Sequence, residues 1–542
     1  MKKTIRKTVF IFFMILMVLS FVNIAGAADR PLRMASGWPA FIDPAVGSDL
    51  TACKLLVNIY DTLIFNDSDT GLPGPFVAKS WEVTDEGKTW IFYLNEGINF
   101  HDGSELTAED VKFSMDRITT IGEGYAYLFL DKVASSEVID KYTISFHLKY
   151  PIGPFLGILS RLYILNEDLV LNNIEKPGPY GDLGDYGKQW LNTHDAGSGP
   201  YIVKEYLPEE SVTLDMNPNY WRSLDPEVPD ELIVYNITES TTIKSMLLKR
   251  DLEMGYHASS RETLEALDKI EGIDIKRSPQ LGEMYFMLNT KKAPTDDVHF
   301  RKAMAWGLDY QTIVAKTWYG VTESRGPIPK GMPGYDPTVL EYKQDFGKAQ
   351  EELQKSKYYQ ELDKYPVDVY WLDRAPDEEK IALLFMSNMA KLGIKVRPIK
   401  VPWAKVVEDS GSIESSPHIV TATTSGDYLE AGSLLETKYK SASAATWEQN
   451  EWLLDPELDQ RIDDAIRTID QKERFAEYSE LIKYIHEDLC PTICLFDMAF
   501  NIPYQSAYMD WPDAKSALLT GYEYYLPNIK IYPEKRKALL DK

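Results

Sequence analysis

Four short patterns contain residue types that could perform chemistry, but each lacks a part that its chemistry requires. Residues 486–490 (HEDLC) begin like a zinc-protease helix but have no second histidine. Residues 122–124 (GEG) lack the third glycine of a dinucleotide loop, and residues 197–199 (GSG) lack the flanking residues of a nucleophile elbow. The aspartates within 67–71 do not have the spacing of a calcium loop. We therefore expect no catalytic residue, no metal site and no cofactor.

The histidines and cysteines do not form a ligand pattern either. The seven histidines are scattered, at positions 101, 147, 194, 257, 299, 418 and 486. Cys490 and Cys494 lie in the apolar run 489–496, which predicts a buried strand. Residues four apart on a strand are about 13 Å apart, which is beyond the reach of a disulfide. We expect these two cysteines and Cys53 to be small buried hydrophobic residues.

Composition and charge indicate a globular chain with organic rather than nucleic-acid partners. The 542 residues are 44% hydrophobic and 26% charged, and a chain of this length predicts two to four domains. A formal charge of −25 disfavours binding to nucleic acid or to anionic membranes. The 33 tyrosines and 12 tryptophans suit an apolar pocket that can also form hydrogen bonds.

The N-terminus has the order of a secretory signal peptide. Basic residues within 2–7 precede an apolar run at 9–22, and Ala25-Gly26-Ala27 follows with small residues at the cleavage-determining positions. The alternative is an uncleaved anchor, but the run is shorter than the roughly 20 residues that span a bilayer. We expect residues 1–27 to be removed, and no lipid anchor because no cysteine lies nearby. The mature chain is then a soluble, extracytoplasmic protein.

The elements that would position a pocket are mixed α and β. A hairpin is predicted from strands at 80–83 and 90–94, and Thr107 with Asp110 predicts a capping box in front of a helix. Further strands are expected within 136–149, at 394–401 and at 489–496. Further helices are expected at 298–310, 346–357, 378–392, 458–469 and 472–489. Residues 178–187 form a loop rich in glycine and tyrosine, and no long linker separates domains.

Several stretches, taken in order, resemble one family. They are Ala78–Val83 with Trp90–Leu94, Gly97–Gly103 and Leu106–Val111; Gly197–Tyr201 with Asn217–Trp221; Asn289-Thr290 with Asp297–Ala303; Gly326–Pro329; and Leu392–Val396. Together they resemble the extracellular solute-binding proteins that include the oligopeptide-, dipeptide- and nickel-binding proteins of ABC importers. The resemblance covers nearly the whole mature chain, and its motifs are mostly turns, caps and strand entries.

The resemblance implies an α/β fold of the periplasmic-binding-protein type II class, a large Venus flytrap with two lobes. The implied division is 28–282 for lobe one with an inserted subdomain at about 61–190, 283–500 for lobe two, and 501–542 for a return to lobe one. The chain would cross between lobes near 276–286 and 496–504. A ligand held between the lobes would favour the closed form, which the importer would recognise.

By the same resemblance, Asp427 is the leading ligand-binding candidate. Residues 427–431 (DYLEA) match a motif whose aspartate holds a peptide's α-amino group, with Ala431 in place of proline. A buried carboxylate suits an ammonium group through a charge-assisted hydrogen bond. The alternative is an exposed loop acid, and the tryptophan that often precedes the motif is absent from 420–426.

The remaining candidates are backbone contacts and aromatic walls. Residues 47–49, which are Gly47, Ser48 and Asp49, match a strand-like contact to the peptide backbone. Trp38 and Trp403 are pocket walls or ordinary core residues, and Gln280, Ser425 and Gly426 complete the predicted site.

Three hypotheses for function stay open at this point. The first is a peptide-binding subunit of an ABC importer, monomeric, with permease subunits as partners and no nucleic acid. The second is an oligosaccharide-binding protein of the same fold, which would use stacked aromatic residues. The third is a secreted enzyme or a sensor-coupled receptor. A carboxylate in the pocket would favour the first of these, and parallel aromatic faces without a buried charge would favour the second.

Overall fold

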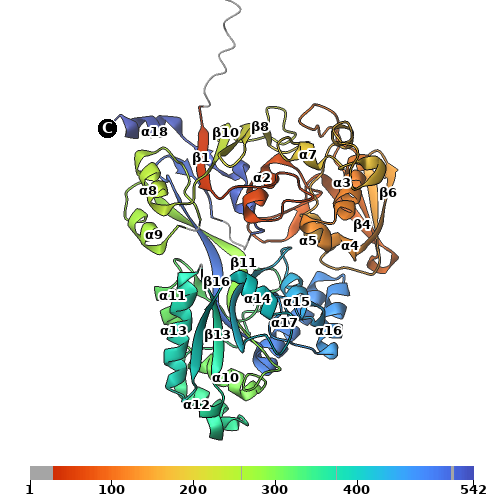
Figure 1. Ribbon diagram of the computed structural model, residues 1–542. Coiled ribbons are helices and arrows are strands. Elements are labelled where there is room, and N and C mark those ends of the chain that lie inside the picture. The colour runs from red at the N-terminus through yellow and green to blue at the C-terminus, as the bar shows by residue number, and fades with distance from the viewer. Residues whose placement is uncertain (1–28, 258, 374, 514–517, 542) are drawn as a thin grey trace, which may run out of the picture.

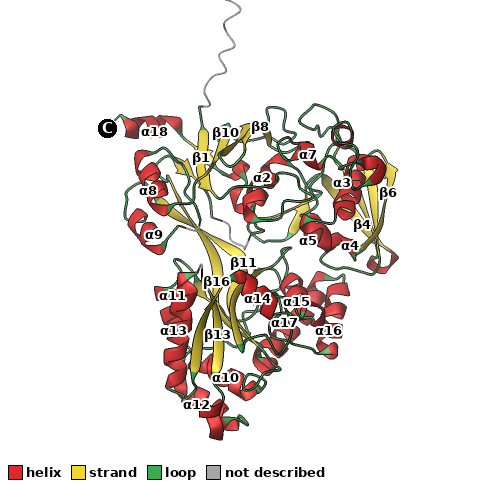
Figure 2. Ribbon diagram, viewed as in Figure 1, coloured by secondary structure: helices red, strands yellow, loops and turns green. Residues whose placement is uncertain are grey.

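The protein is built as two bodies joined by two long strands. The computed structural model describes residues 29–257, 259–373, 375–513 and 518–541, so the predicted signal peptide lies outside the described residues. Strands β11 (Asp274–Leu288) and β16 (Thr492–Tyr504) pair antiparallel and run from one body into the other (Figure 1). Helices surround the sheets of each body (Figure 2). Among the described residues, no helix has both the length and the apolar character needed to cross a membrane.

The first body contains a four-stranded sheet near the N-terminus. Its order is β1 (Pro31–Ser36), β10 (Glu231–Asn236), β9 (Ser211–Met216) and β8 (Tyr201–Leu207). β1 and β10 are parallel, and the other pairs are antiparallel. Helix α2 (Leu50–Ile59) is buried for most of its length and packs against this sheet, whereas α8 (Ser240–Lys249) and α9 (Arg261–Leu267) lie nearer the long strands.

A second four-stranded sheet extends the first body to one side. Its order is β4 (Ala78–Thr84), β5 (Thr89–Leu94), β7 (Thr143–Leu148) and β6 (Val133–Asp140), with antiparallel pairing throughout. The predicted hairpin and strand pair are confirmed. The capping box is confirmed too, because Asp110 Oδ2 accepts from the Thr107 N–H at 2.9 Å at the start of α3 (Ala108–Ile121). Smaller elements complete this part: β2 (Ile64–Asn66), β3 (Pro73–Pro75), α4 (Tyr127–Leu130), α5 (Phe155–Leu159), α6 (Glu167–Leu171) and α7 (Lys188–Leu191).

The second body is organised around a six-stranded mixed sheet. Its order is β12 (Thr322–Glu323), β16, β11, β15 (Ile419–Ser425), β13 (Val367–Leu372) and β14 (Val396–Val401). The helices that accompany it are α10 (Val298–Gly307), α11 (Tyr310–Lys316), α12 (Phe346–Lys355), α13 (Pro376–Ala390) and α14 (Trp403–Asp409). Gly393 has φ +78° in the turn that follows α13, as expected for a residue that ends a helix.

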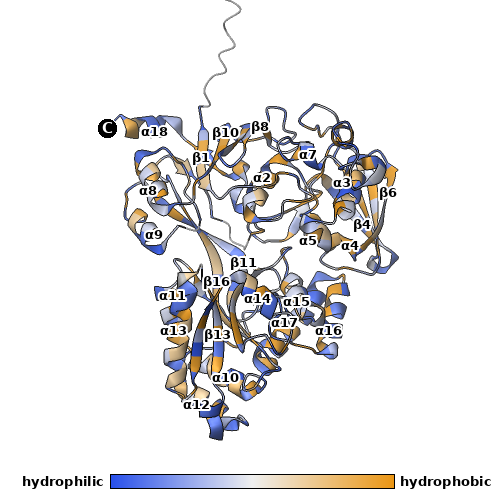
Figure 3. Ribbon diagram, viewed as in Figure 1, coloured by the Kyte–Doolittle hydropathy of each residue, from blue (hydrophilic) through white to orange (hydrophobic). Residues whose placement is uncertain are grey.

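Three more helices of the second body extend beneath the side sheet of the first. They are α15 (Ala431–Tyr439), α16 (Pro456–Arg467) and α17 (Gln471–Lys483). Apolar and polar residues alternate along α16 (Figure 3), and its buried face carries Leu458, Ile462 and Ile466. The two bodies touch here, since the Gly153 N–H donates to the Ile466 carbonyl at 2.8 Å.

The C-terminal segment returns to the first body. It contains β17 (Met509–Asp510), β18 (Lys530–Ile531) and α18 (Pro533–Leu540). The Leu526 N–H donates to Asn58 Oδ1 at 2.9 Å, which ties this segment to α2. Both ends of the described chain therefore lie on the same body (Figure 1).

Three predicted elements were wrong in detail. The helix predicted at 298–310 is two helices, because Leu308 is extended and Asp309 begins α11 by accepting a hydrogen bond from the Thr312 N–H. The helix predicted at 472–489 ends at Lys483 and continues as a π-helical turn. Cys490 then takes a left-handed conformation and lies outside the strand, which begins at Thr492. All three cysteines are buried, as expected, and none is in a disulfide.

Candidate functional site

A cavity of about 480 Å³ lies where the two bodies meet beside the long strands. The first body contributes the loop in front of α2, the start of α4 and the residues after α5. β11 and β16 contribute Gln280, Gly282, Met498 and Phe500. The second body contributes the end of β15, one side of α15 and the loop before α16. The cavity is thus bordered by both bodies and by the strands that join them.

Six of the nine predicted site residues line this cavity: Ser48, Asp49, Gln280, Ser425, Gly426 and Asp427. The segment 425–427 reaches the cavity because it continues from the end of β15, whose last residues pair with β11. Asp49 and Ser48 reach it from the other side, since Asp49 begins α2 and its carboxylate accepts from the Thr51 and Ala52 N–H groups.

Trp38, Gly47 and Trp403 are not among the described residues that line the cavity. Trp38 packs edge-on against Tyr206, with ring centroids 5.1 Å apart. Gly47 is buried, and an added Cβ would lie 2.9 Å from the Ala52 Cβ, so only glycine fits there without a shift.

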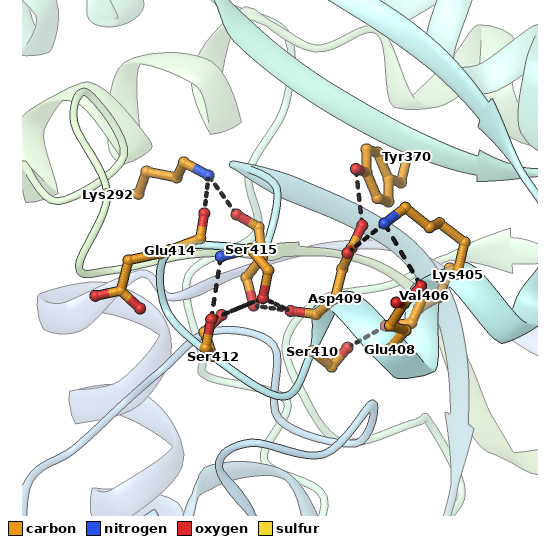
Figure 4. A network of polar contacts seen from close by, with 11 residues as sticks. Lys292, Tyr370, Lys405, Val406, Glu408, Asp409, Ser410, Ser412, Glu414 and Ser415 are labelled. Atoms are coloured by element: carbon orange, nitrogen blue, oxygen red, sulfur yellow. Dashed lines mark hydrogen bonds and ion pairs between the residues drawn. The ribbon is translucent and has the colours of Figure 1, made fainter.

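Trp403 supports the wall through a second tryptophan. Its ring packs at 5.1 Å against Trp447, which does line the cavity. Trp403 is the first residue of α14, whose last residue, Asp409, accepts hydrogen bonds from the Tyr370 hydroxyl at 3.0 Å and from Lys405 at 2.6 Å (Figure 4). The Asp409 carbonyl also accepts from the Ser415 hydroxyl at 2.8 Å. These contacts fix the helix and therefore the tryptophan pair.

Asp427 presents a carboxylate without a cation bound to it. It is partly buried and forms no ion pair with any described residue. Burial raises the pKa of Asp427 above its ordinary value, whereas a hydrogen bond with Tyr127 and the charge of Arg161 act in the opposite direction. Its backbone is held in place, because its N–H donates to the Ser433 hydroxyl at 2.7 Å.

Arg161 is a cavity residue that the sequence analysis missed. It is 1% exposed; its Nε donates to the Asp427 carbonyl at 3.0 Å and its Nη1 to the Thr520 carbonyl at 3.1 Å. Its guanidinium also lies 4.6 Å from the Tyr125 ring centroid. A signal was present, since this arginine is the single charged residue in the otherwise apolar run 155–165.

Other residues of the second body were also missed. Lys438 lines the cavity, is 1% exposed and pairs with the buried Glu451. Trp447 and Glu448 enter from the loop before α16. No local pattern marked these residues, because the loop has neither a motif nor a strong periodicity.

Comparison with known proteins identifies the family. Residues 73–446 match the family model described as "Bacterial extracellular solute-binding proteins, family 5 Middle". The chain belongs to this family. The predicted resemblance is therefore confirmed, and the family consists of substrate-binding transport proteins rather than enzymes.

Curated relatives within the family match over most of their length. The probable D,D-dipeptide-binding periplasmic protein of Escherichia coli is 29% identical over 460 residues, which cover 83% of this chain and 85% of the relative. Di/tripeptide-binding protein 3 of Pseudomonas aeruginosa is 24% identical over 525 residues, covering 92% and 95%.

Solved structures confirm the predicted fold class. The ABC transporter substrate-binding protein CtaP of Listeria monocytogenes superposes with a TM-score of 0.80 at 19% identity, covering 93% of this chain and 100% of that one. The periplasmic binding protein DppA of Helicobacter pylori, solved with the peptide STSA, gives 0.71 at 22% identity, covering 93% and 99%. The family-5 chain thus has the type II periplasmic-binding fold.

Proposed function

We propose that this chain is the extracytoplasmic subunit of an ABC importer and that it captures peptides, with Asp427 binding the peptide's α-ammonium group. The observation that carries the proposal is a partly buried carboxylate that borders the interlobe cavity and has no ion-pair partner among the described residues. A buried charge without a partner costs free energy, and a ligand ammonium would remove that cost. The names of the relatives, a D,D-dipeptide-binding and a di/tripeptide-binding protein, support the same ligand class.

The oligosaccharide alternative lacks support from the cavity and from these relatives. A sugar site would offer parallel aromatic faces, whereas the neighbouring cavity rings of Tyr125 and Tyr127 are tilted by 47° at 6.4 Å. A neutral sugar would also leave the Asp427 charge unpaired. A sensor-coupled receptor on the same scaffold would require a partner other than the permease subunits, and no feature of the site favours one.

The test of the ligand role compares a free with an N-acetylated peptide. If the ammonium–carboxylate pair is desolvated on closure, Asp427→Asn weakens peptide binding by about 2–5 kcal/mol, or about 30- to several-thousand-fold. Acetylation of the peptide weakens binding similarly, and the two changes together cost little more than either alone. Calorimetric titration of the wild type, Asp427→Asn and the exposed control Glu408→Gln measures all three. The assignment would be rejected if the wild type bound the free and the acetylated peptide equally well. It would also be rejected if the wild type and Asp427→Asn both bound a neutral oligosaccharide tightly.

Ligand capture is proposed to occur by hinge closure. The proposed lobes are 28–282, with the subdomain at about 61–190, and 283–500, with 501–542 returning to the first. The long pairing of β11 with β16 supports a hinge at the crossing. We expect a monomer. Its radius of gyration, measured by X-ray scattering, should fall when peptide is added, and an unchanged scattering curve at saturating peptide would exclude closure.

Export is proposed through the predicted signal, with the mature chain beginning near Ala28, without a lipid anchor and without nucleic acid as a partner. The periplasmic relatives support this compartment. N-terminal sequencing of protein from its host tests the cleavage, and a chain that begins at Met1 would refute it.

A further inference from the structure

The charged residues that line the cavity are not all accounted for by the contacts described above. Asp49 caps α2, and Lys438 is neutralised by Glu451. Arg161 lies against the Asp427 backbone and favours the ionised form of that carboxyl. Glu448 is left over. Its carboxylate has no hydrogen-bond or ion-pair partner among the described residues.

The charged neighbour that acts on Glu448 has the same sign. Burial raises the pKa of Glu448, and the charge of Asp427 raises it further. Tyr127 lies near both, since the pKa of its hydroxyl is raised by burial, then by the charge of Asp427 and, to a smaller extent, by that of Glu448. Two carboxylates on one side of a cavity repel each other unless one of them is protonated or a cation enters.

The accessible charge of the cavity is negative, although its lining contains two cations. Arg161 and Lys438 are each 1% exposed, whereas Asp427 and Glu448 are only partly buried and can meet a ligand. A chain of formal charge −25 adds a field of the same sign. The accessible negative charge of the cavity is therefore larger than the charge that a single ammonium group would neutralise.

A second, independent feature indicates a polar ligand here. Thr424 lines the cavity and is 8% exposed; its hydroxyl interacts with that of Tyr285, and neither hydroxyl has a hydrogen bond of good geometry among the described residues. A buried hydroxyl without a partner is destabilising, so a polar group of the ligand would relieve it. Beside Glu448, Trp447 offers a ring that can cover an aliphatic stem or face a cation.

We propose that Glu448 receives a second cationic group of the ligand, so that the site selects short peptides with a lysine, ornithine or arginine side chain close to their N-terminal ammonium. The inference rests on the proposed peptide-binding function, and it assigns the α-ammonium to Asp427 and the basic side chain to Glu448. Each carboxylate can form a charge-assisted hydrogen bond with one cationic group, so the two carboxylates match a ligand with two cations.

The test uses pairs of peptides that differ in one charge. Lys-Ala is compared with Nle-Ala, and Ala-Lys with Ala-Nle, because norleucine keeps the aliphatic stem without the ammonium. Affinities are measured by calorimetry at pH 7 for the wild type, Glu448→Gln and the exposed control Glu408→Gln. In the wild type and the control, we expect the lysine peptide of at least one pair to bind about 5- to 30-fold more tightly. In Glu448→Gln that ratio should fall to about 1–2, with little change for the norleucine peptides.

The outcomes distinguish a failure of the Glu448 inference from a failure of the proposed peptide-binding function. Equal affinities for lysine and norleucine peptides in the wild type would overturn the inference and leave the peptide-binding function standing. A lysine preference that survives in Glu448→Gln would overturn the assignment to Glu448. If the wild type binds none of the four peptides, the proposed function fails and the inference fails with it. The comparison in the wild type does not depend on how well the variant folds.

Discussion

Two carboxylates only three residues apart have opposite roles in this structure. Glu430 is 6% exposed and accepts two hydrogen bonds from Arg474, at 2.7 and 2.8 Å, and one from the Tyr478 hydroxyl at 2.9 Å. No cation among the described residues pairs with Asp427, which borders the cavity. Both belong to the motif that the sequence analysis selected. One acid fixes the second body, and the other is available to a ligand.

The difference suggests that pairing, more than burial, separates a structural charge from the one that we propose is functional. Buried acids with a matched base occur in both bodies: Glu430 pairs with Arg474 in the second, and in the first Arg117 pairs through both Nη atoms with Asp43, at 2.6 and 2.7 Å. At the cavity, Asp427 and Glu448 keep their desolvation cost because no cation in the described part of the chain pairs with them. An unmatched charge costs stability in the empty protein, and that cost becomes available as binding free energy.

The largest expected effect on the free energy of unfolding follows from removing the charge of Glu430, the acid that pairs with Arg474. Glu430→Gln leaves the buried Arg474 without its counter-ion and should lower the free energy of unfolding by about 3–5 kcal/mol. Asp427→Asn should leave stability unchanged or raise it, because burial opposes ionisation of Asp427. Urea unfolding of both variants measures the difference.

The comparison is sharpened by measuring peptide binding of the same two variants under native conditions. Folded Glu430→Gln should bind peptide within a few-fold of the wild type, whereas Asp427→Asn should not. If Asp427→Asn proved the less stable of the two, the separation of roles would be wrong.

A third arrangement lies on the strands that join the bodies, where two acids face each other. Glu283 and Asp497 are directly opposed in the register of β11 and β16, and they are 0% and 9% exposed. Glu283 Oε2 and Asp497 Oδ1 are buried without a hydrogen-bond donor among the described residues. Burial, then the charge of Asp497, raises the pKa of Glu283 well above its ordinary value. This pair is satisfied by a proton instead of a base.

A smaller effect, dependent on pH, is expected from Glu283→Gln. Because the folded-state pKa of Glu283 is above its unfolded value of about 4.3, the native state keeps a proton that the unfolded state has lost. The stability of the wild type should therefore fall as pH rises from about 4.3. In the variant, an amide donor replaces the proton, so it should be more stable than the wild type by about 1–3 kcal/mol at pH 8.

Urea unfolding between pH 4 and pH 8 measures how the difference in stability between Glu283→Gln and the wild type changes with pH. Tyr285 and Cys494 near Glu283 have raised pKa values and titrate above that window. A constant difference between variant and wild type across the range would mean that Glu283 does not titrate there.

The smallest effect is expected at an ion pair on the surface. Lys188 and Glu123 lie 2.7 Å apart with side chains 30% and 48% exposed. Glu123→Gln should change the free energy of unfolding by about 0–1 kcal/mol, because water screens the pair. The decrease in the melting temperature of Glu123→Gln relative to the wild type should become smaller still at high salt. A loss as large as that of Glu430→Gln would remove the distinction between buried and exposed pairs.

Local elements were predictable where the deciding contacts are close in sequence. The capping box of Thr107 and Asp110 needs only four consecutive residues, and the hairpin at 80–94 needs a turn between two alternating runs. The helix at 298–310 was predicted too long because its apolar spacing continues past Leu308, where the Asp309 cap restarts the chain. Cys490 was assigned to a strand because its apolar neighbours are typical of one, although a π-helical turn precedes it.

The sequence by itself determined the family, the order of most elements and two acids of the cavity, Asp49 and Asp427, because these depend on short motifs and on local hydrogen bonds. Only the tertiary structure decided which charges are matched. Glu430 is matched by Arg474, 44 residues away, whereas Arg161, 266 residues from Asp427, donates to the Asp427 backbone carbonyl and not to its carboxylate. Whether a carboxylate meets a protein cation or a cavity is set by packing between distant segments. No local pattern of residue types contains that information.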